Sequence, residues 1–205
     1  MTQDMTPTAA ADMTPTAAKS QLTSSLATTG LAGLVRARVQ RSLLMCDCSG
    51  SMADHLRSGQ SKHAALQTVV SELRETHAVP LVAFGVRPSA ENNYRTVEVV
   101  DTLPRPSGGT PLDEAIAFGQ KEGATHLIVV TDGQPDSEIR AFEAARAFKN
   151  QIDVFYIGDG NDRGAKFAAE LAKMTGGTAN VTDLGQPKQL TSAIKGLLGA
   201  PGMSL

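Results

Sequence analysis

Two aspartates that each follow a short apolar run are the first positions in this sequence that could carry chemistry. Asp47 comes directly after Leu43–Cys46, and Asp132 comes directly after Leu127–Thr131. Short apolar runs bounded by turn residues are typical of buried strands in a parallel sheet. Ligands of open α/β sheets gather beyond the carboxyl ends of the strands. We therefore expect the two carboxylates to face each other across a crevice at one edge of a sheet.

Hydroxyl side chains occur in glycine-containing segments near the same expected edge. Ser49 and Ser51 flank a glycine just after Asp47, and Thr110 follows a pair of glycines. Because glycine permits tight turns, the three hydroxyl oxygens are expected to approach one point. Carboxylate and hydroxyl oxygens suit a hard cation such as Mg²⁺, with Mn²⁺ or Ca²⁺ as alternatives. The predicted metal site consists of Asp47, Ser49, Ser51, Thr110 and Asp132.

The charge of this predicted site determines what it could bind. Two carboxylates at most balance a divalent cation, and hydroxyl groups add no charge. A metal held partly through water would therefore stay electrophilic at an open position. An incoming Asp or Glu side chain could complete the shell through a charge-assisted contact. The pattern predicts capture of a carboxylate from a partner protein.

The three segments together resemble the metal-ion-dependent adhesion site of von Willebrand factor A domains. They are Asp47-Cys-Ser49-Gly-Ser51, Thr110 in Gly-Gly-Thr-Pro-Leu, and Asp132 in Thr-Asp-Gly, in that chain order. The resemblance implies that the two serines and the threonine bind the metal directly or nearly so. It implies that the two aspartates hold the metal largely through water and that a partner protein supplies the acidic ligand. Members of the family inside cells commonly serve as assembly adaptors.

The elements that must position these residues follow from hydrophobic periodicity. From about residue 42, short apolar runs alternate with helix-period segments, and residues 94–100 alternate like an edge strand paired antiparallel. The predicted fold is α/β, with a Rossmann-like, doubly wound, mostly parallel sheet of about six strands, one antiparallel edge strand and helices on both faces. The other predicted strands are Leu43–Cys46, Val79–Phe84, Leu127–Val130 and Ile152–Ile157. Helix-period spacing predicts five buried helix faces, which are Leu66/Val69/Val70/Leu73, Leu112/Ala115/Ile116, Ile139/Phe142/Ala145/Phe148, Ala165/Ala168/Leu171/Ala172 and Leu190/Ala193/Ile194/Leu197/Leu198.

Segments of different composition flank the predicted domain, which spans residues 41–198. Residues 1–20 contain a repeated heptapeptide, Asp4–Ala10 and Asp12–Ala18, that cannot bury a core, so we predict a flexible tail. Residues 21–40 carry scattered apolar side chains and are interpreted as a possible helix or linker, and residues 199–205 as a C-terminal tail.

Composition limits the classes of partner and the compartment. The net charge of -2 and the pI of about 6.1 argue against nucleic acid, which needs clustered Lys and Arg, and the longest uncharged stretch is too short for membrane insertion. A strand would hold Cys46 and Cys48 too far apart and too rigidly for an unstrained disulfide, so we predict free thiols, Cys46 buried and Cys48 in a loop. Free thiols favour a cytoplasmic location, with a virion or other large assembly as the alternative.

Ordinary structural roles could explain each segment taken alone. Thr110 before a proline is a typical helix N-cap, Asp132 before glycine is a common turn, and Asp47 could cap a following helix. The segment Gly158–Gly164 looks like a dinucleotide fingerprint, but its glycine spacing is one residue too long. We interpret it as a turn in which Asp162 caps the next helix.

Two other functions remain open beside a metal-dependent binding module. One is a structural subunit of a phage or bacterial assembly with a non-essential site. The other is an Mg²⁺-dependent phosphoryl-transfer or hydrolytic enzyme that uses Asp47 as nucleophile or ligand. Against the enzyme, the predicted metal loops hold no Lys or Arg, and no Walker-type glycine loop with lysine occurs. The prediction is therefore a binding module and not an enzyme.

Overall fold

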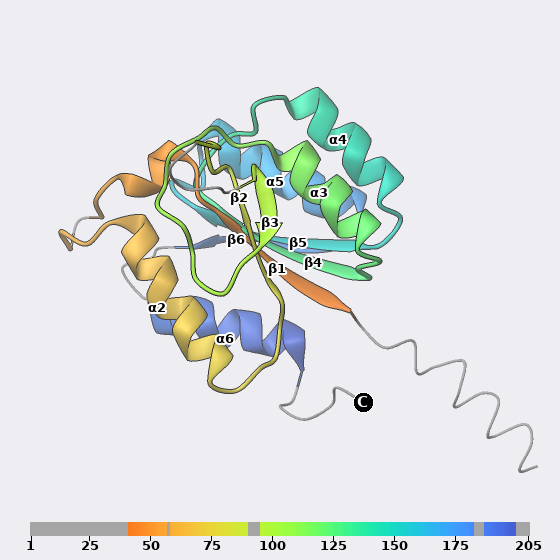
Figure 1. The fold of residues 1–205 in the computed structure, drawn as a ribbon. Coiled ribbons are helices and arrows are strands. Elements are labelled where there is room, and N and C mark those ends of the chain that lie inside the picture. Colours follow the sequence, from red (N-terminus) through yellow and green to blue (C-terminus); the bar gives the residue numbers. More distant parts are fainter. Residues whose placement is uncertain (1–40, 57, 90–94, 183–186, 200–205) are drawn as a thin grey trace, which may run out of the picture. The chain divides into compact units, whose positions relative to one another are not determined.

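A six-stranded sheet lies at the centre of the fold, with the strand order β3-β2-β1-β4-β5-β6 (Figure 1). Strand β3 pairs antiparallel with β2, and the other neighbours are parallel. The predicted fold class is confirmed, including the antiparallel edge strand. The strands are β1 (Ser42–Asp47), β2 (Leu81–Phe84), β3 (Val97–Val99), β4 (His126–Thr131), β5 (Gln151–Ile157) and β6 (Ala179–Thr182).

The computed structural model describes residues 41–56, 58–89, 95–182 and 187–199. The predictions of a flexible tail over residues 1–20 and of a helix or linker over residues 21–40 lie outside the described residues. The same holds for residues 200–205 of the predicted C-terminal tail.

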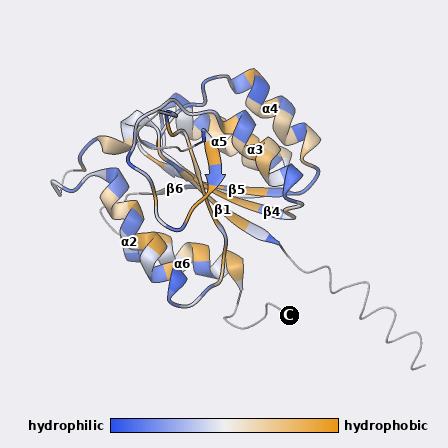
Figure 2. Ribbon diagram, viewed as in Figure 1, coloured by the Kyte–Doolittle hydropathy of each residue, from blue (hydrophilic) through white to orange (hydrophobic). Residues whose placement is uncertain are grey.

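Helices cover both faces of the sheet (Figure 1). The helices α2 and α6 pack on one face, whereas α3, α4 and α5 pack on the other. Since both faces are covered, the central strands are apolar on each side, and Figure 2 shows this concentration of apolar residues along the strands. The helices are α2 (Lys62–Arg74), α3 (Leu112–Lys121), α4 (Glu138–Ala147), α5 (Arg163–Met174) and α6 (Pro187–Leu198), and a short 3-10 helix η1 spans Gly50–Ala53.

Two details differ from the expectations. Strand β6 lies in a short polar segment that the periodicity did not single out. Ile139 was predicted to face the core but is 73% exposed, because α4 turns Ala141 and Ala145 toward the sheet instead. Cys48 lies in the loop after β1 and is a free thiol like Cys46, as predicted, and its side chain is fully buried against the α2 side of the sheet.

A buried polar network ties three strands together at the amino end of the sheet. The His126 ring nitrogen Nε2 lies 2.5 Å from Asp153 Oδ2, and its Nδ1 lies 3.2 Å from the Ser42 hydroxyl. The Thr178 amide and hydroxyl donate to the other Asp153 oxygen at 2.6 and 2.7 Å. These bonds satisfy an acid with no solvent exposure, as a buried charge requires. The network lies at the opposite end of the strands from Asp47 and Asp132.

Candidate metal-binding site

The two acids predicted to form the site come from neighbouring central strands. Asp47 is the last residue of β1, and Asp132 directly follows the last residue of β4. Strands β1 and β4 pair in parallel, and the order of the sheet reverses between them. Both carboxylates therefore lie at the topological switch point, where α/β sheets bind their ligands.

Asp47 is held rigidly at the bottom of the cluster. Its side chain is fully buried; its Oδ1 accepts the Ser49 amide at 2.7 Å and its Oδ2 accepts the Thr131 hydroxyl at 2.5 Å. Burial raises the pKa of Asp47 to about 7, and the nearby Asp132 charge adds to the rise, while the two hydrogen bonds oppose it. A cation nearby would stabilise the ionised carboxylate.

The loop after β1 is fastened to the loop that precedes α3. Ser49 forms a parallel bridge with Gly108, and the Gly50 amide donates to the Gly108 carbonyl at 2.9 Å. Gly85 beside them has a φ of 85°, and a Cβ there would lie 2.6 Å from the Gly109 carbonyl oxygen. Only glycine fits this position, because a side chain would push the two loops apart.

Hydroxyl oxygens from these loops converge around Gly133. The Ser51 hydroxyl lies 3.1 Å from the Ser49 hydroxyl and donates to Asp132 Oδ1 at 2.8 Å. A Cβ on Gly133 would lie 3.1 Å from Thr110 Oγ1, 3.8 Å from Ser51 Oγ and 4.0 Å from Asp47 Oδ2. The structure thus brings all five predicted residues into one cluster beside Gly133, where an added side chain would crowd the Thr110 hydroxyl.

The Thr110 hydroxyl does not cap α3, so the alternative interpretation of this residue is wrong. The N-cap position is occupied by Pro111, with no side-chain capping bond. The Thr110 backbone is instead tied to Asp136, whose Oδ1 accepts the Thr110 amide and whose own amide donates to the Thr110 carbonyl, both at 2.9 Å. These bonds fix the residue and leave its hydroxyl available to the cluster.

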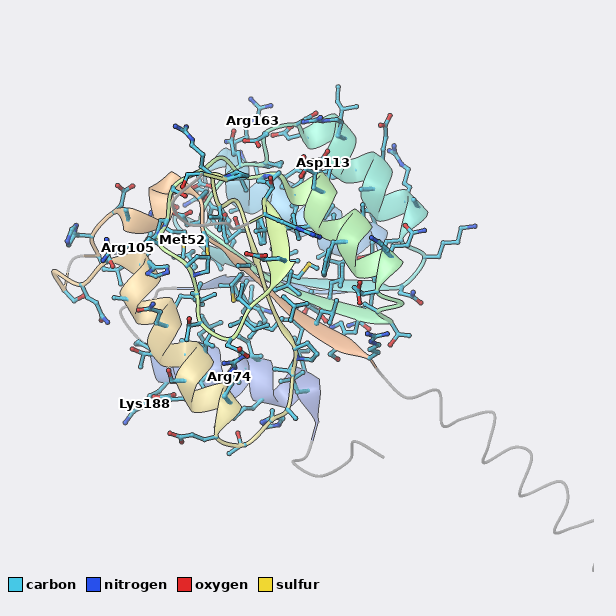
Figure 3. All side chains as sticks on the ribbon, in the orientation of Figure 1. Met52, Arg74, Arg105, Asp113, Arg163 and Lys188 are labelled. Atoms are coloured by element: carbon cyan, nitrogen blue, oxygen red, sulfur yellow. The ribbon has the colours of Figure 1, made fainter. Side chains whose placement is uncertain are left out.

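The turn η1, which begins after Ser49 and contains Ser51, is anchored by one apolar side chain. Met52, labelled in Figure 3, has no solvent exposure and packs into the core on the α2 side of the sheet. The Met52 amide donates to the Ser49 carbonyl at 3.1 Å. The buried side chain therefore fixes the turn that presents the Ser51 hydroxyl.

The structure places a basic residue at this site that the sequence analysis did not predict. The Lys62 ammonium lies 2.5 Å from Asp132 Oδ2, with the Asp132 side chain fully buried and the Lys62 side chain 21% exposed. The residues are 70 positions apart in the chain. No Lys or Arg lies in the metal loops themselves, as expected, but Lys62 reaches the site from the first position of α2. The one feature of the sequence that bears on this contact is that the segment after Asp47 leads into the helix whose first residue is Lys62.

The chemistry of the cluster fits a hard cation. Among the described residues, no group of three or more His, Cys, Asp or Glu side chains gathers at one point. A metal at this edge would therefore depend on hydroxyl oxygens in addition to Asp47 and Asp132. Such an all-oxygen set suits Mg²⁺, which commonly keeps several water ligands.

The glycine-rich segment after β5 forms a turn and a helix cap, as predicted. Asp162 Oδ1 accepts the Ala165 amide at 2.8 Å at the start of α5. Its other oxygen accepts the Tyr156 hydroxyl at 2.8 Å. The Asp162 carboxylate is therefore engaged in holding the start of the helix against β5.

Comparison with known proteins identifies the family to which the fold belongs. The model of the von Willebrand factor type A domain matches residues 43–194. The chain belongs to the von Willebrand factor type A domain family. This family suggests a protein-interaction or adhesion module.

A solved structure with the same fold is that of proximal thread matrix protein 1 from the mussel byssus. It superposes with a TM-score of 0.53 at 13% sequence identity, covering 76% of this chain and 45% of that chain. The present von Willebrand factor A domain thus spans less than half of the mussel protein, and the likeness concerns the fold alone. A comparison with curated protein sequences gives no match. No helix in the described ranges is long and apolar enough to cross a membrane.

Proposed function

We propose that this von Willebrand factor A domain is a divalent-metal-dependent protein-binding module. A metal-ion-dependent adhesion site formed by Asp47, Ser49, Ser51, Thr110 and Asp132 would hold Mg²⁺, and Mn²⁺ or Ca²⁺ could replace it. The observation that carries the proposal is the convergence of oxygens of Thr110, Ser51 and Asp47, from two separate segments, within 4.0 Å of the point where a Cβ of Gly133 would lie in the loop after β4. A bound divalent ion would there attract an Asp or Glu carboxylate from a partner protein.

The hydroxyl and carboxylate side chains of the proposed site would have different roles in binding the metal. The hydroxyls of Ser49, Ser51 and Thr110 would face the metal, since they add ligands without adding negative charge. Asp47 and Asp132 would supply the balancing charge, and Asp47 is already oriented by its bonds to the Ser49 amide and the Thr131 hydroxyl. The metal would keep a position open for the partner because hydroxyl ligands neutralise none of its charge.

Phosphoryl transfer is the main competing activity, and the presence of Lys62 removes one objection to it. The stronger objection is the position of Asp47. Its carboxylate is fully buried, and each of its oxygens already accepts a hydrogen bond. A nucleophile must reach the substrate, so this buried acid favours binding over covalent catalysis. We also propose a cytoplasmic location, with which the two free thiols are compatible.

Thermal unfolding with Mg²⁺, Mn²⁺ or EDTA tests the metal site. A site-bound ion should raise the melting temperature of the wild type by mass action. Asp47→Ala and Thr110→Ala should abolish this rise, whereas Asp101→Ala should keep it because that side chain is fully exposed. An equal rise in all four proteins would show that the ion binds elsewhere.

A pull-down with Mg²⁺ compared with EDTA then tests the partner. Capture of a protein that needs Mg²⁺, and that is lost in Thr110→Ala, would support the binding module. Phosphatase activity that disappears in Asp47→Ala would overturn it in favour of the enzyme.

A further inference from the structure

We infer that Lys62 is a built-in counter-ion that competes with the metal for Asp132 and makes metal binding depend on the partner's carboxylate. The inference rests on the proposed function and deepens it. It concerns how the site is controlled and not whether the site exists.

Lys62 and Ser51 each contact one oxygen of the Asp132 carboxylate. Oδ1 accepts the Ser51 hydroxyl at 2.8 Å, and Oδ2 receives the Lys62 ammonium at 2.5 Å. The Asp132 side chain has no solvent exposure. A cation approaching this acid must therefore share it with an ammonium that is already in contact.

The location of Lys62 in its helix shows that the site attracts the ammonium. Lys62 is the first residue of α2, where the helix dipole disfavours a positive charge. The second acid near the ammonium is Asp54, at 3.9 Å, but its side chain is 71% exposed and water screens it. The buried Asp132 carboxylate is therefore the principal group that holds Lys62 over the site.

The buried charges determine the consequence for metal binding. With a metal bound, Asp47 and Asp132 would both be ionised and carry two negative charges, and Lys62 adds one positive charge. A divalent cation would leave the buried site with one net positive charge, which a carboxylate from a partner would neutralise. Lys62 therefore disfavours the metal alone and favours the metal together with an acidic ligand. By linkage, the acidic ligand raises the affinity for the metal by the same factor as the metal raises the affinity for the ligand.

Titration of the purified chain with Mn²⁺, followed by electron paramagnetic resonance, tests this inference. Lys62→Met should raise the affinity for Mn²⁺ in chloride buffer by about tenfold. Acetate, used as the carboxylate probe, should raise the Mn²⁺ affinity of the wild type more than that of Lys62→Met. Lys62→Arg should stay close to the wild type because it keeps the charge. Lys121→Met, at an exposed position on α3, is the matched control and should change neither affinity.

The outcomes separate this inference from the proposed function. Mn²⁺ binding by the wild type, with equal or weaker binding by Lys62→Met, overturns the role of Lys62 and leaves the metal site standing. Binding by Lys62→Met alone supports the inference, because the ammonium then excludes the ion. Binding by neither protein overturns the metal site and the inference together. Lys62→Gln gives the same readout if the methionine variant does not fold.

Discussion

The Ser51 hydroxyl donates a hydrogen bond of 2.8 Å to Asp132 Oδ1, which joins the loop after β1 to the loop after β4. The two residues are 81 positions apart in the chain. The bond spans the switch point of the sheet, so it orients a hydroxyl and an acid toward one point before any ligand binds. This pre-formed arrangement avoids part of the ordering cost that binding would otherwise carry.

Ser51→Ala should weaken metal binding without unfolding the domain. The substitution removes one proposed ligand and the bond that orients Asp132, and we expect a loss of about 10-fold or more in Mn²⁺ affinity. Isothermal titration calorimetry measures this loss. Ser71→Ala is the control, because the exposed Ser71 hydroxyl bonds only to the Gln67 carbonyl of its own helix. Equal affinities of Ser51→Ala and the wild type would remove Ser51 from the site.

Gly133→Ala should block the space in which the metal is proposed to bind. The added methyl group would lie 3.1 Å from Thr110 Oγ1, close enough to crowd the hydroxyl while the fold persists. We expect Mg²⁺ to lose its effect on the melting temperature of this variant. Gly196→Ala is the matched control, since a Cβ there meets nothing within 4 Å and lies in helix α6. It should retain the Mg²⁺ effect and stabilise the fold by up to about 1 kcal/mol. A normal Mg²⁺ response in Gly133→Ala would place the ion elsewhere.

Asp153→Asn should reduce stability and flatten its dependence on acidic pH. Burial by itself would raise the pKa of Asp153, but hydrogen bonds from Thr178, His126 and Gln151 more than offset this and lower it. A folded-state pKa below the unfolded value contributes stability that is present above the unfolded pKa of about 3.9 and lost as the pH falls through the folded value. We expect Asp153→Asn to cost about 3 kcal/mol at neutral pH, because it weakens the hydrogen bonds that Thr178, His126 and Gln151 make with a buried carboxylate.

Urea unfolding at a series of pH values measures this effect. The free energy of unfolding of the wild type should fall more steeply below about pH 4 than that of Asp153→Asn. Asp101→Asn serves as the control, since Asp101 is fully exposed. Parallel curves for the wild type and Asp153→Asn would contradict the lowered pKa.

Met52→Ala should affect both stability and metal affinity. The Met52 side chain has no exposure, so its truncation should cost about 2–5 kcal/mol in free energy of unfolding. The loosened turn should also present Ser51 less precisely and weaken Mn²⁺ binding. Met174→Ala, at a position that is 39% exposed, should change both quantities much less. A destabilised Met52→Ala with unchanged Mn²⁺ affinity would show that the turn does not position the serine.

The fold class could be predicted because it depends on local patterns. Apolar runs such as Leu127–Val130 are buried on both faces, and the helix-period residues Leu66 and Val69 have no exposure. Strand β6 was not predicted, because it is a short polar segment whose extended conformation comes from pairing with β5. The exposure of Ile139 shows the same limit, since its neighbours in α4 fit the α3–α5 face of the sheet better.

The sequence by itself determined which residue types would gather at the carboxyl end of the sheet. Asp47 and Asp132 end apolar runs, and the parallel arrangement of β1 and β4 brings such ends together. Chain order was therefore sufficient to predict that Asp47 and Asp132 lie at one edge of the sheet.

Only the tertiary structure determined which charged residues lie beside the predicted site residues. The contact between Lys62 and Asp132 depends on where α2 begins over the sheet, and the hydrogen bonds among Ser42, His126, Asp153 and Thr178 depend on three strands meeting. Neither set of contacts can be predicted from spacing along the chain, because electrostatic interactions depend on distance in space and produce no periodic pattern in the sequence.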